Sequence, residues 1–248
     1  MKRLSPYGVW ALAAYAVCLL ATVPARVVWP GLRGRLPAGV RVAGIRGTVW
    51  EGRLAVFVPA ASAAGPLCEV RFRFTPLALI RGRAGYALSL AGKVQGRMRV
   101  TRGPGAWGVS NLAVTAPARV LDALVPLART VRPRGVLALR ARTLVWGRHG
   151  AGHGTLIWSK ASVTGAPAGP AGDYAVRFAV ADQAVSYRIR TLTGALRLTG
   201  RGRYRPASGQ LSFAGDLSAR SGHLRGIMAR VGVADGRSRR HMAFRVIL

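Results

Sequence analysis

Acidic side chains are scarce in this chain of 248 residues: seven Asp and Glu stand against 38 Lys and Arg, and the formal net charge is +31. The acids are scattered singly, so the sequence offers no paired carboxylates for acid–base catalysis. It also lacks a glycine-rich phosphate loop and a G-x-S-x-G nucleophile turn. His149 and His153 are four residues apart, but the glycines around them disfavour the helix that would align them as metal ligands. We therefore expect no enzyme activity, no catalytic residues, no metal and no cofactor.

Cysteine and lysine are also rare. Cys18 lies inside an apolar N-terminal run and Cys68 far outside it, which predicts no structural disulfide and a buried apolar thiol at Cys68. Lysine occurs only at positions 2, 93 and 160, so arginine carries nearly all the positive charge. This arginine richness has two readings that the sequence leaves open: a compositional bias of the kind a GC-rich genome produces, or a surface for anionic partners.

The basic residues are spread over nearly every predicted strand instead of one recognition element, so we expect no nucleic-acid partner. The same charge would favour contact with anionic lipid or lipopolysaccharide headgroups. In so positive a chain, we also expect each exported acid to pair with an arginine.

One long apolar run lies at the N-terminus. Residues 7–25 carry no charged side chain, and as a helix they would span roughly 28 Å, close to a bilayer core. Val23, Pro24 and Ala25 also resemble a cleavage site, so a cleaved signal peptide is the competing interpretation. We expect a cytoplasmic N-terminus over 1–6, a transmembrane anchor over 7–29 and a β-rich domain over 30–248, across the inner membrane.

Apolar and polar residues alternate through most of the remaining chain, as in strands with one buried and one solvated face. In several runs the polar position is arginine, whose methylenes can lie along a sheet while the guanidinium stays in water. The runs are 70–74, 174–178, 187–190, 196–199, 211–213 and 242–246. Antiparallel sheets show this pattern, and short glycine-containing turns separate the runs. The expected fold class is all-β: one N-terminal transmembrane helix followed by an elongated antiparallel sheet with at most one or two short helices.

Two segments depart from the alternation. Residues 116–130 place Val120, Leu121, Leu124 and Val125 on one helical face, and Pro126 would end or kink that helix. Residues 165–172, rich in glycine and proline, predict a loop.

A series of short glycine-rich blocks, in order, resembles the type II secretion system protein N family. The blocks cover 21–26, 42–52, 70–82, 154–161, 172–174, 193–200 and 231–237. The residues that carry the resemblance are Gly44, Gly47, Trp50, Gly52, Pro76, Gly82, Trp158, Gly172, Tyr174, Gly194, Leu196 and Gly200. Glycines 44, 47 and 52 also predict, from the residues alone, a tight strand–turn–strand around a structurally important Trp50.

The resemblance implies a single-pass protein of the inner membrane of a Gram-negative bacterium, with a cytoplasmic N-terminus and a periplasmic body. It implies an accessory part of the type II secretion system that supports protein transport across the outer membrane by contacts with other secretion components. The alternative is a periplasmic β-groove that handles lipid or bridges the envelope, because the apolar faces of elongated sheets can carry acyl chains.

Overall fold

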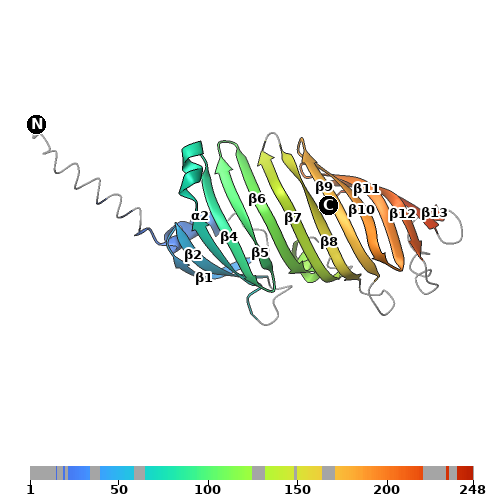
Figure 1. Ribbon diagram of the computed structural model, residues 1–248, viewed down its shortest axis with the longest axis horizontal. Coiled ribbons are helices and arrows are strands. Elements are labelled where there is room, and N and C mark those ends of the chain that lie inside the picture. The colour runs from blue at the N-terminus through green and yellow to red at the C-terminus, as the bar shows by residue number, and fades with distance from the viewer. Residues whose placement is uncertain are drawn as a thin grey trace, which may run out of the picture.

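The computed structural model describes residues 15, 19, 22–33, 40–58, 65–124, 132–147, 150–163, 171–219, 233–234 and 239–247. In this part of the chain, fourteen antiparallel strands form a single sheet in the order β1-β2-β3-β4-β5-β6-β7-β8-β9-β10-β11-β12-β14-β13. Each strand from β1 to β11 pairs with the next one along the chain, β12 pairs with β14, and Figure 1 shows the meander as a colour sequence from blue to red. The all-β antiparallel prediction is confirmed.

The first half of the sheet contains β1 (Arg41–Gly47), β2 (Glu51–Phe57), β3 (Cys68–Phe74), β4 (Ala84–Gly92), β5 (Gln95–Gly103), β6 (Ala106–Pro117) and β7 (Arg134–Gly147). The second half contains β8 (Ala151–Ser162), β9 (Gly172–Ala181), β10 (Ala184–Gly194), β11 (Leu196–Arg205), β12 (Gln210–Ala219), β13 (Val233–Ala234) and β14 (Arg239–Ile247). All six predicted alternating runs lie within strands, namely β3, β9, β10, β11, β12 and β14.

The sheet has one apolar face and one arginine-rich face. Side chains alternate between the two faces along each strand, and the register of the strand pairs places the apolar positions of neighbouring strands on the same face. The central row of the apolar face, in register from β2 to β14 except at the bulge between Met98 and Leu112, is Gly52, Phe72, Leu88, Met98, Leu112, Ala141, Gly154, Phe178, Tyr187, Gly202, Phe213 and Phe244. Three glycines of this row lie beneath rings of adjacent strands: Phe72 covers Gly52, Phe178 covers Gly154, and Tyr187 covers Gly202. A Cβ at these positions would overlap the rings.

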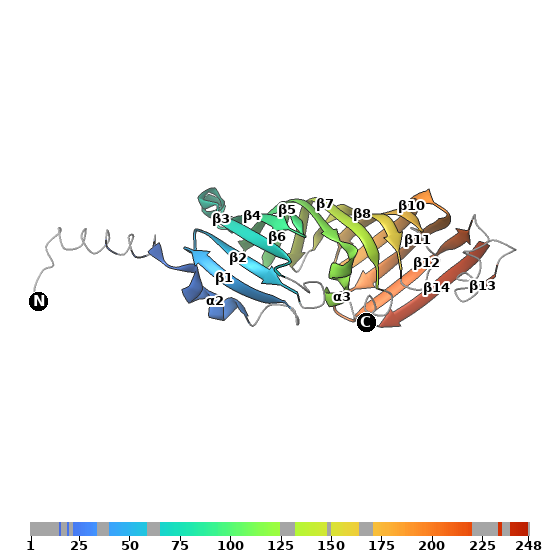
Figure 2. The same ribbon diagram turned by 90° about the horizontal axis from the view of Figure 1, so that it is seen from below.

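The sheet bows into an arch (Figure 2). Its apolar face is the inner side, because the segment beneath the arch packs against apolar side chains of the sheet. A short segment, η2 (Ala118–Val120) and α3 (Leu121–Leu124), lies beneath the arch, and Val120 packs against the apolar cluster of Val58, Leu67, Cys68 and Val94. Curvature crowds the inner side chains, so Leu144 is only 3% exposed although a single layer of strands carries it. We therefore call the apolar side the inner face and the arginine side the outer face.

Other helical segments are short: α2 (Ala25–Arg33) before the sheet and the 3-10 turn η1 (Pro76–Arg81) between β3 and β4. No helix in the described ranges is both long and apolar enough to span a bilayer, and most of the predicted anchor over 7–29 lies outside those ranges. Most of the predicted loop over 165–172 is also outside them, and its last residue, Gly172, already begins β9.

The predicted helix over 116–130 is wrong at its start. Ala116 and Pro117 are the last residues of β6 and pair with Leu137 and Val136 of β7. Helical geometry begins only at Ala118 and continues through Leu124, beyond which residues 125–131 lie outside the described part. The inner-face packing of Ala116 against the Cys68 cluster favours the extended conformation over the local helical pattern.

Candidate functional site

The outer face carries two long rows of side chains that run across the strands. The first row is continuous in register from β2 to β12: Arg53, Arg71, Ser89, Arg97, Ala113, Arg140, Thr155, Arg177, Arg188, Arg201 and Ala214. The second row lies two residues away along each strand and includes Glu51, Arg73, Arg99, His153, Ser186, Arg203, Ser212 and Arg245. Neighbouring strands are about 4.8 Å apart, so the arginines form closely spaced lines of positive charge.

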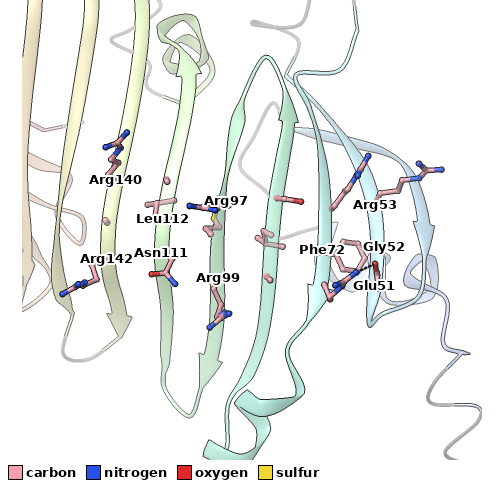
Figure 3. Close-up of a pocket in the computed structure, with 18 of the residues that line it drawn as sticks. Glu51, Gly52, Arg53, Phe72, Arg97, Arg99, Asn111, Leu112, Arg140 and Arg142 are labelled. Atoms are coloured by element: carbon pink, nitrogen blue, oxygen red, sulfur yellow. Dashed lines mark hydrogen bonds and ion pairs between the residues drawn. The ribbon is translucent and has the colours of Figure 1, made fainter.

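A trough runs between these two rows, and we call it the arginine trough. Its floor is the backbone of the central inner-face row, whose side chains point to the opposite side of the sheet. Over β1–β8 the trough encloses a hollow of about 1280 Å³, and over β9–β12 one of about 760 Å³. Figure 3 shows Arg53 of β2, Arg97 and Arg99 of β5, and Arg140 and Arg142 of β7 around the larger hollow.

Two bulges shape the middle of the arginine trough. The register shifts between Arg97 and Arg99 where β5 meets β6, and between Ala141 and Thr143 where β7 meets β8. Asn111 is the extra residue of β6 and has a φ of 53°, a left-handed conformation that asparagine tolerates better than most residues. Bulges increase local twist and redirect side chains, and these two bring Asn111 and Arg142 to the lining of the hollow.

Among the described residues, acids neutralise arginines at only one end of the arginine trough. The Glu51 carboxylate accepts a hydrogen bond from Arg73 at 2.9 Å, and Arg71 contacts Glu69 at 3.3 Å. The Arg73 guanidinium, by hydrogen bond and charge, holds the pKa of Glu51 below its usual value. The prediction that acids pair with arginine is thus confirmed for these two. It is wrong for Asp216, which contacts His241 at 3.2 Å.

The other end of the trough has three arginines directly opposite one another on adjacent strands: Arg177, Arg188 and Arg201. Within the described residues no ion pair joins them to an acid. Like charges directly opposite destabilise a sheet, and an anion bridging them would relieve that repulsion. Guanidinium groups bind carboxylate and phosphate through two parallel hydrogen bonds, so the trough has the chemistry to hold an elongated anionic ligand.

The residues that carry the family resemblance lie in two groups, and of the twelve only Gly47 and Gly52 line the larger hollow of the trough. The first group surrounds the β1–β2 turn, where Gly44 and Gly47 take φ values of 65° and 96°. Trp50 packs edge-on against Phe74 with ring centroids 4.9 Å apart, which supports the structural role predicted for it. Pro76 begins η1, and Gly82 ends it with a φ of 64°.

The second group joins β8, β9, β10 and β11 near the opposite edge of the sheet. The Trp158 indole N–H donates to the Arg134 carbonyl at 2.9 Å, and the Tyr174 hydroxyl donates to the Leu196 carbonyl at 3.0 Å. Gly172 pairs with Gly194, where a Cβ on either residue would overlap backbone. The last member, Gly200, lies under the Phe213 ring on the inner face. These residues maintain strand geometry and offer no convergent chemistry.

One carboxylate ties the second group together. Asp173 accepts the backbone N–H of Lys160 at 2.7 Å and the Thr193 hydroxyl at 2.9 Å. Lys160 has a φ of 51° and sits in the register shift between Trp158 and Ala161. These hydrogen bonds, the one from Lys160 first, lower the pKa of Asp173. The carboxylate therefore caps a bulge, a role different from the arginine pairing that we predicted for it.

The remaining candidates from the sequence are one cysteine and two histidines. Cys68 is 4% exposed within the inner-face cluster, as predicted, and burial raises the pKa of its thiol. His153 lines the trough, whereas His149 lies outside the described residues. What the sequence did not reveal is the alignment of arginines from distant segments into two rows, because register is not visible in any single strand.

Comparison with known proteins gives one match. The model of the family described as "Type II secretion system (T2SS), protein N" matches residues 38–242, which include all described strands except the last residues of β14. No curated protein and no solved structure matches the chain. This match agrees with the resemblance in the sequence, and the chain belongs to the type II secretion system protein N family.

Proposed function

We propose that the protein is an accessory component of the type II secretion system, anchored in the inner membrane, whose periplasmic sheet contacts other secretion components through the arginine trough. The match of the family model to residues 38–242 is the observation that carries the proposal. The trough supplies the contact chemistry, because its two rows can bind carboxylate side chains of an acidic partner segment bidentately. Membrane anchoring would raise the local concentration of partners on the same surface, so even weak contacts would suffice.

A secretion assay tests this role. In a host lacking its own copy, the wild-type gene should restore release of secreted proteins into the medium. The variant R97Q/R99Q/R140Q/R142Q, which removes four arginines around the larger hollow, should reduce that release and weaken in-cell crosslinking to other secretion components. All four positions are exposed on the outer face, so folding should survive.

A matched variant locates the contact along the trough. R177Q/R188Q/R201Q/R203Q removes the same charge over the smaller hollow. Loss of secretion in one variant only would assign the contact to that segment, and loss in both would assign it to the whole trough. Normal secretion and an unchanged crosslinking pattern in both, at wild-type protein levels, would refute the proposed contact surface.

Lipid handling is the second candidate, and the continuous apolar row of the inner face favours it. Acyl chains bound there would have to displace side chains that already contact one another, such as Leu112, Leu144 and Val180. Mass spectrometry of the purified protein after detergent exchange, comparing wild type with Leu88→Glu on the inner face, tests it. Stoichiometric lipid lost in the variant would support this candidate, and none in the wild type would exclude it.

A further inference from the structure

Three large apolar side chains of η1 face solvent. Ile80 is 82% exposed, Leu77 is 72% and Leu79 is 55%, while the small Ala78 faces the sheet. Ala78 fits closely over Gly85, where a Cβ would come within 2.9 Å of the Ala78 methyl. The turn thus buries its small residue and presents its large ones, the reverse of the usual partition.

Two tryptophans lie at the same edge of the sheet. Trp107 of β6 and Trp146 of β7 pair directly across the strands and are 46% and 44% exposed. The Arg102 guanidinium covers the Trp107 ring at 4.7 Å from its centroid. Exposed tryptophan beside arginine is typical of the membrane–water interface, where the indole is half apolar and the cation meets lipid phosphate.

We call this side of the sheet, where one set of strand ends and turns lies, the η1 edge; it runs across the strands and is not an outermost strand. It is formed by the connections β1–β2, β3–β4, β5–β6, β7–β8, β9–β10 and β11–β12. The opposite edge carries the β4–β5 turn with Lys93 as well as η2 and α3. Figure 1 shows η1 projecting beyond the strands at the N-terminal end of the sheet.

The N-terminal segment also reaches the sheet at the η1 edge. The Val49 N–H donates to the Val23 carbonyl at 3.0 Å, and Pro24 bridges to Thr48. The β1–β2 turn also lies next to η1. The Phe74 N–H, at the end of β3, donates to the Trp50 carbonyl of that turn, and η1 begins two residues later at Pro76. At about 4.8 Å per strand, Phe74, two residues before η1, lies roughly 10 Å from the end of the apolar N-terminal run.

We propose that the η1 edge docks on the bilayer surface, with Leu77, Leu79, Ile80, Trp107 and Trp146 in the headgroup region. This inference rests on the membrane anchoring in the proposed function. An anchored chain that enters the sheet beside η1 holds this edge against the lipid, and Arg83 and Arg102 match anionic headgroups there. The sheet then projects from the membrane, with Lys93, η2 and α3 on the side away from it.

Site-directed fluorescence in bilayers tests the orientation. The full chain is placed in nanodiscs of phosphatidylethanolamine and phosphatidylglycerol that contain a lipid with a nitroxide high on its acyl chain. Three single-cysteine proteins carry a bimane label: native Cys18 with Cys68→Ala, and Ile80→Cys or Lys93→Cys with both native cysteines replaced by alanine. We expect quenching of the Ile80 label at least twofold stronger than that of the Lys93 label.

The Cys18 label separates two kinds of failure. Quenching at Cys18 without excess quenching at position 80 over position 93 would overturn the docking inference and leave the anchoring intact. An unquenched Cys18 label would refute both. A fourth protein carries the bimane label at Pro104→Cys, in the β5–β6 turn beside Trp107, with both native cysteines replaced by alanine. Its quenching should fall by at least half when Leu77, Leu79 and Ile80 are changed to serine. Unchanged quenching would assign no role to η1.

Discussion

The inner and outer faces of this sheet have the same backbone and opposite chemistry. Leu144 of the inner face is 3% exposed, whereas the Arg71 and Arg73 side chains of the outer face are 69% and 72% exposed. The inner face therefore supplies the apolar burial that stabilises a single-layered protein. The outer face is free to carry charge because its side chains contribute little to packing. Stability and the proposed recognition therefore belong to two sides of one layer, and we expect that each can be changed with little effect on the other.

The largest effect is expected for a truncation on the inner face. Leu144→Ala removes a side chain that contacts the cluster of Leu112, Ala141 and Val180, and should lower the free energy of unfolding by about 2–5 kcal/mol. Arg142→Ala, two residues away on the outer side of β7, is the matched control and should change it by less than about 0.5 kcal/mol. Urea denaturation followed by circular dichroism measures both. Equal losses would contradict the division between the faces.

Replacing a glycine that lies beneath an aromatic ring by alanine should have the next largest effect on stability. In Gly154→Ala the new methyl overlaps the Phe178 ring and lies 2.9 Å from the Arg140 carbonyl oxygen, which should cost about 1–3 kcal/mol. Gly103→Ala meets only Arg83 at 3.4 Å and should be nearly neutral. Adding Phe178→Leu to Gly154→Ala should recover part of the loss in thermal stability. No recovery would show that the backbone contact, not the ring, limits the space.

A smaller effect is expected where a hydroxyl of β9 reaches the start of β11, on the far side of β10. Tyr174→Phe removes the hydrogen bond to the Leu196 carbonyl from a residue that is 6% exposed. This should lower the free energy of unfolding by about 0.5–1.5 kcal/mol. Tyr204→Phe is the control, since within the described part of the chain its hydroxyl makes no hydrogen bond. The midpoint of thermal unfolding should fall for the first variant alone; equal midpoints would assign Tyr174 a packing role only.

The smallest effect concerns the pH dependence of Asp173. Because the pKa of this carboxyl is lowered in the folded state, its ionised form stabilises the fold above the ordinary aspartate pKa, and that contribution is lost as pH falls through the lower folded value. Asp173→Asn should therefore be less stable than wild type at neutral pH and equally stable in strong acid. Thermal melts from pH 7 to pH 2 follow the difference. A difference independent of pH would show that the charge has no part in capping the Lys160 bulge.

Sequence patterns predicted the fold class, six alternating strands and the character of each face. The six alternating runs are strands, arginine lies on the solvent side of five of them, and Cys68 is buried. The helix over 116–130 failed at its start because the pairing of Ala116 and Pro117 with β7 overrides a local periodicity. The arginine trough was not predictable, since a shift of one residue in any pair would move an arginine to the other face.

The sequence by itself determined a two-faced antiparallel protein with an apolar N-terminal run, because the period of two and the scarcity of acids are properties of each segment alone. The tertiary structure decided which face lines the arch, which arginines stand in one row, and that η1, Trp107 and the N-terminal entry share an edge. These depend on register, bulges and curvature, and all three come from pairing between segments that no local pattern encodes.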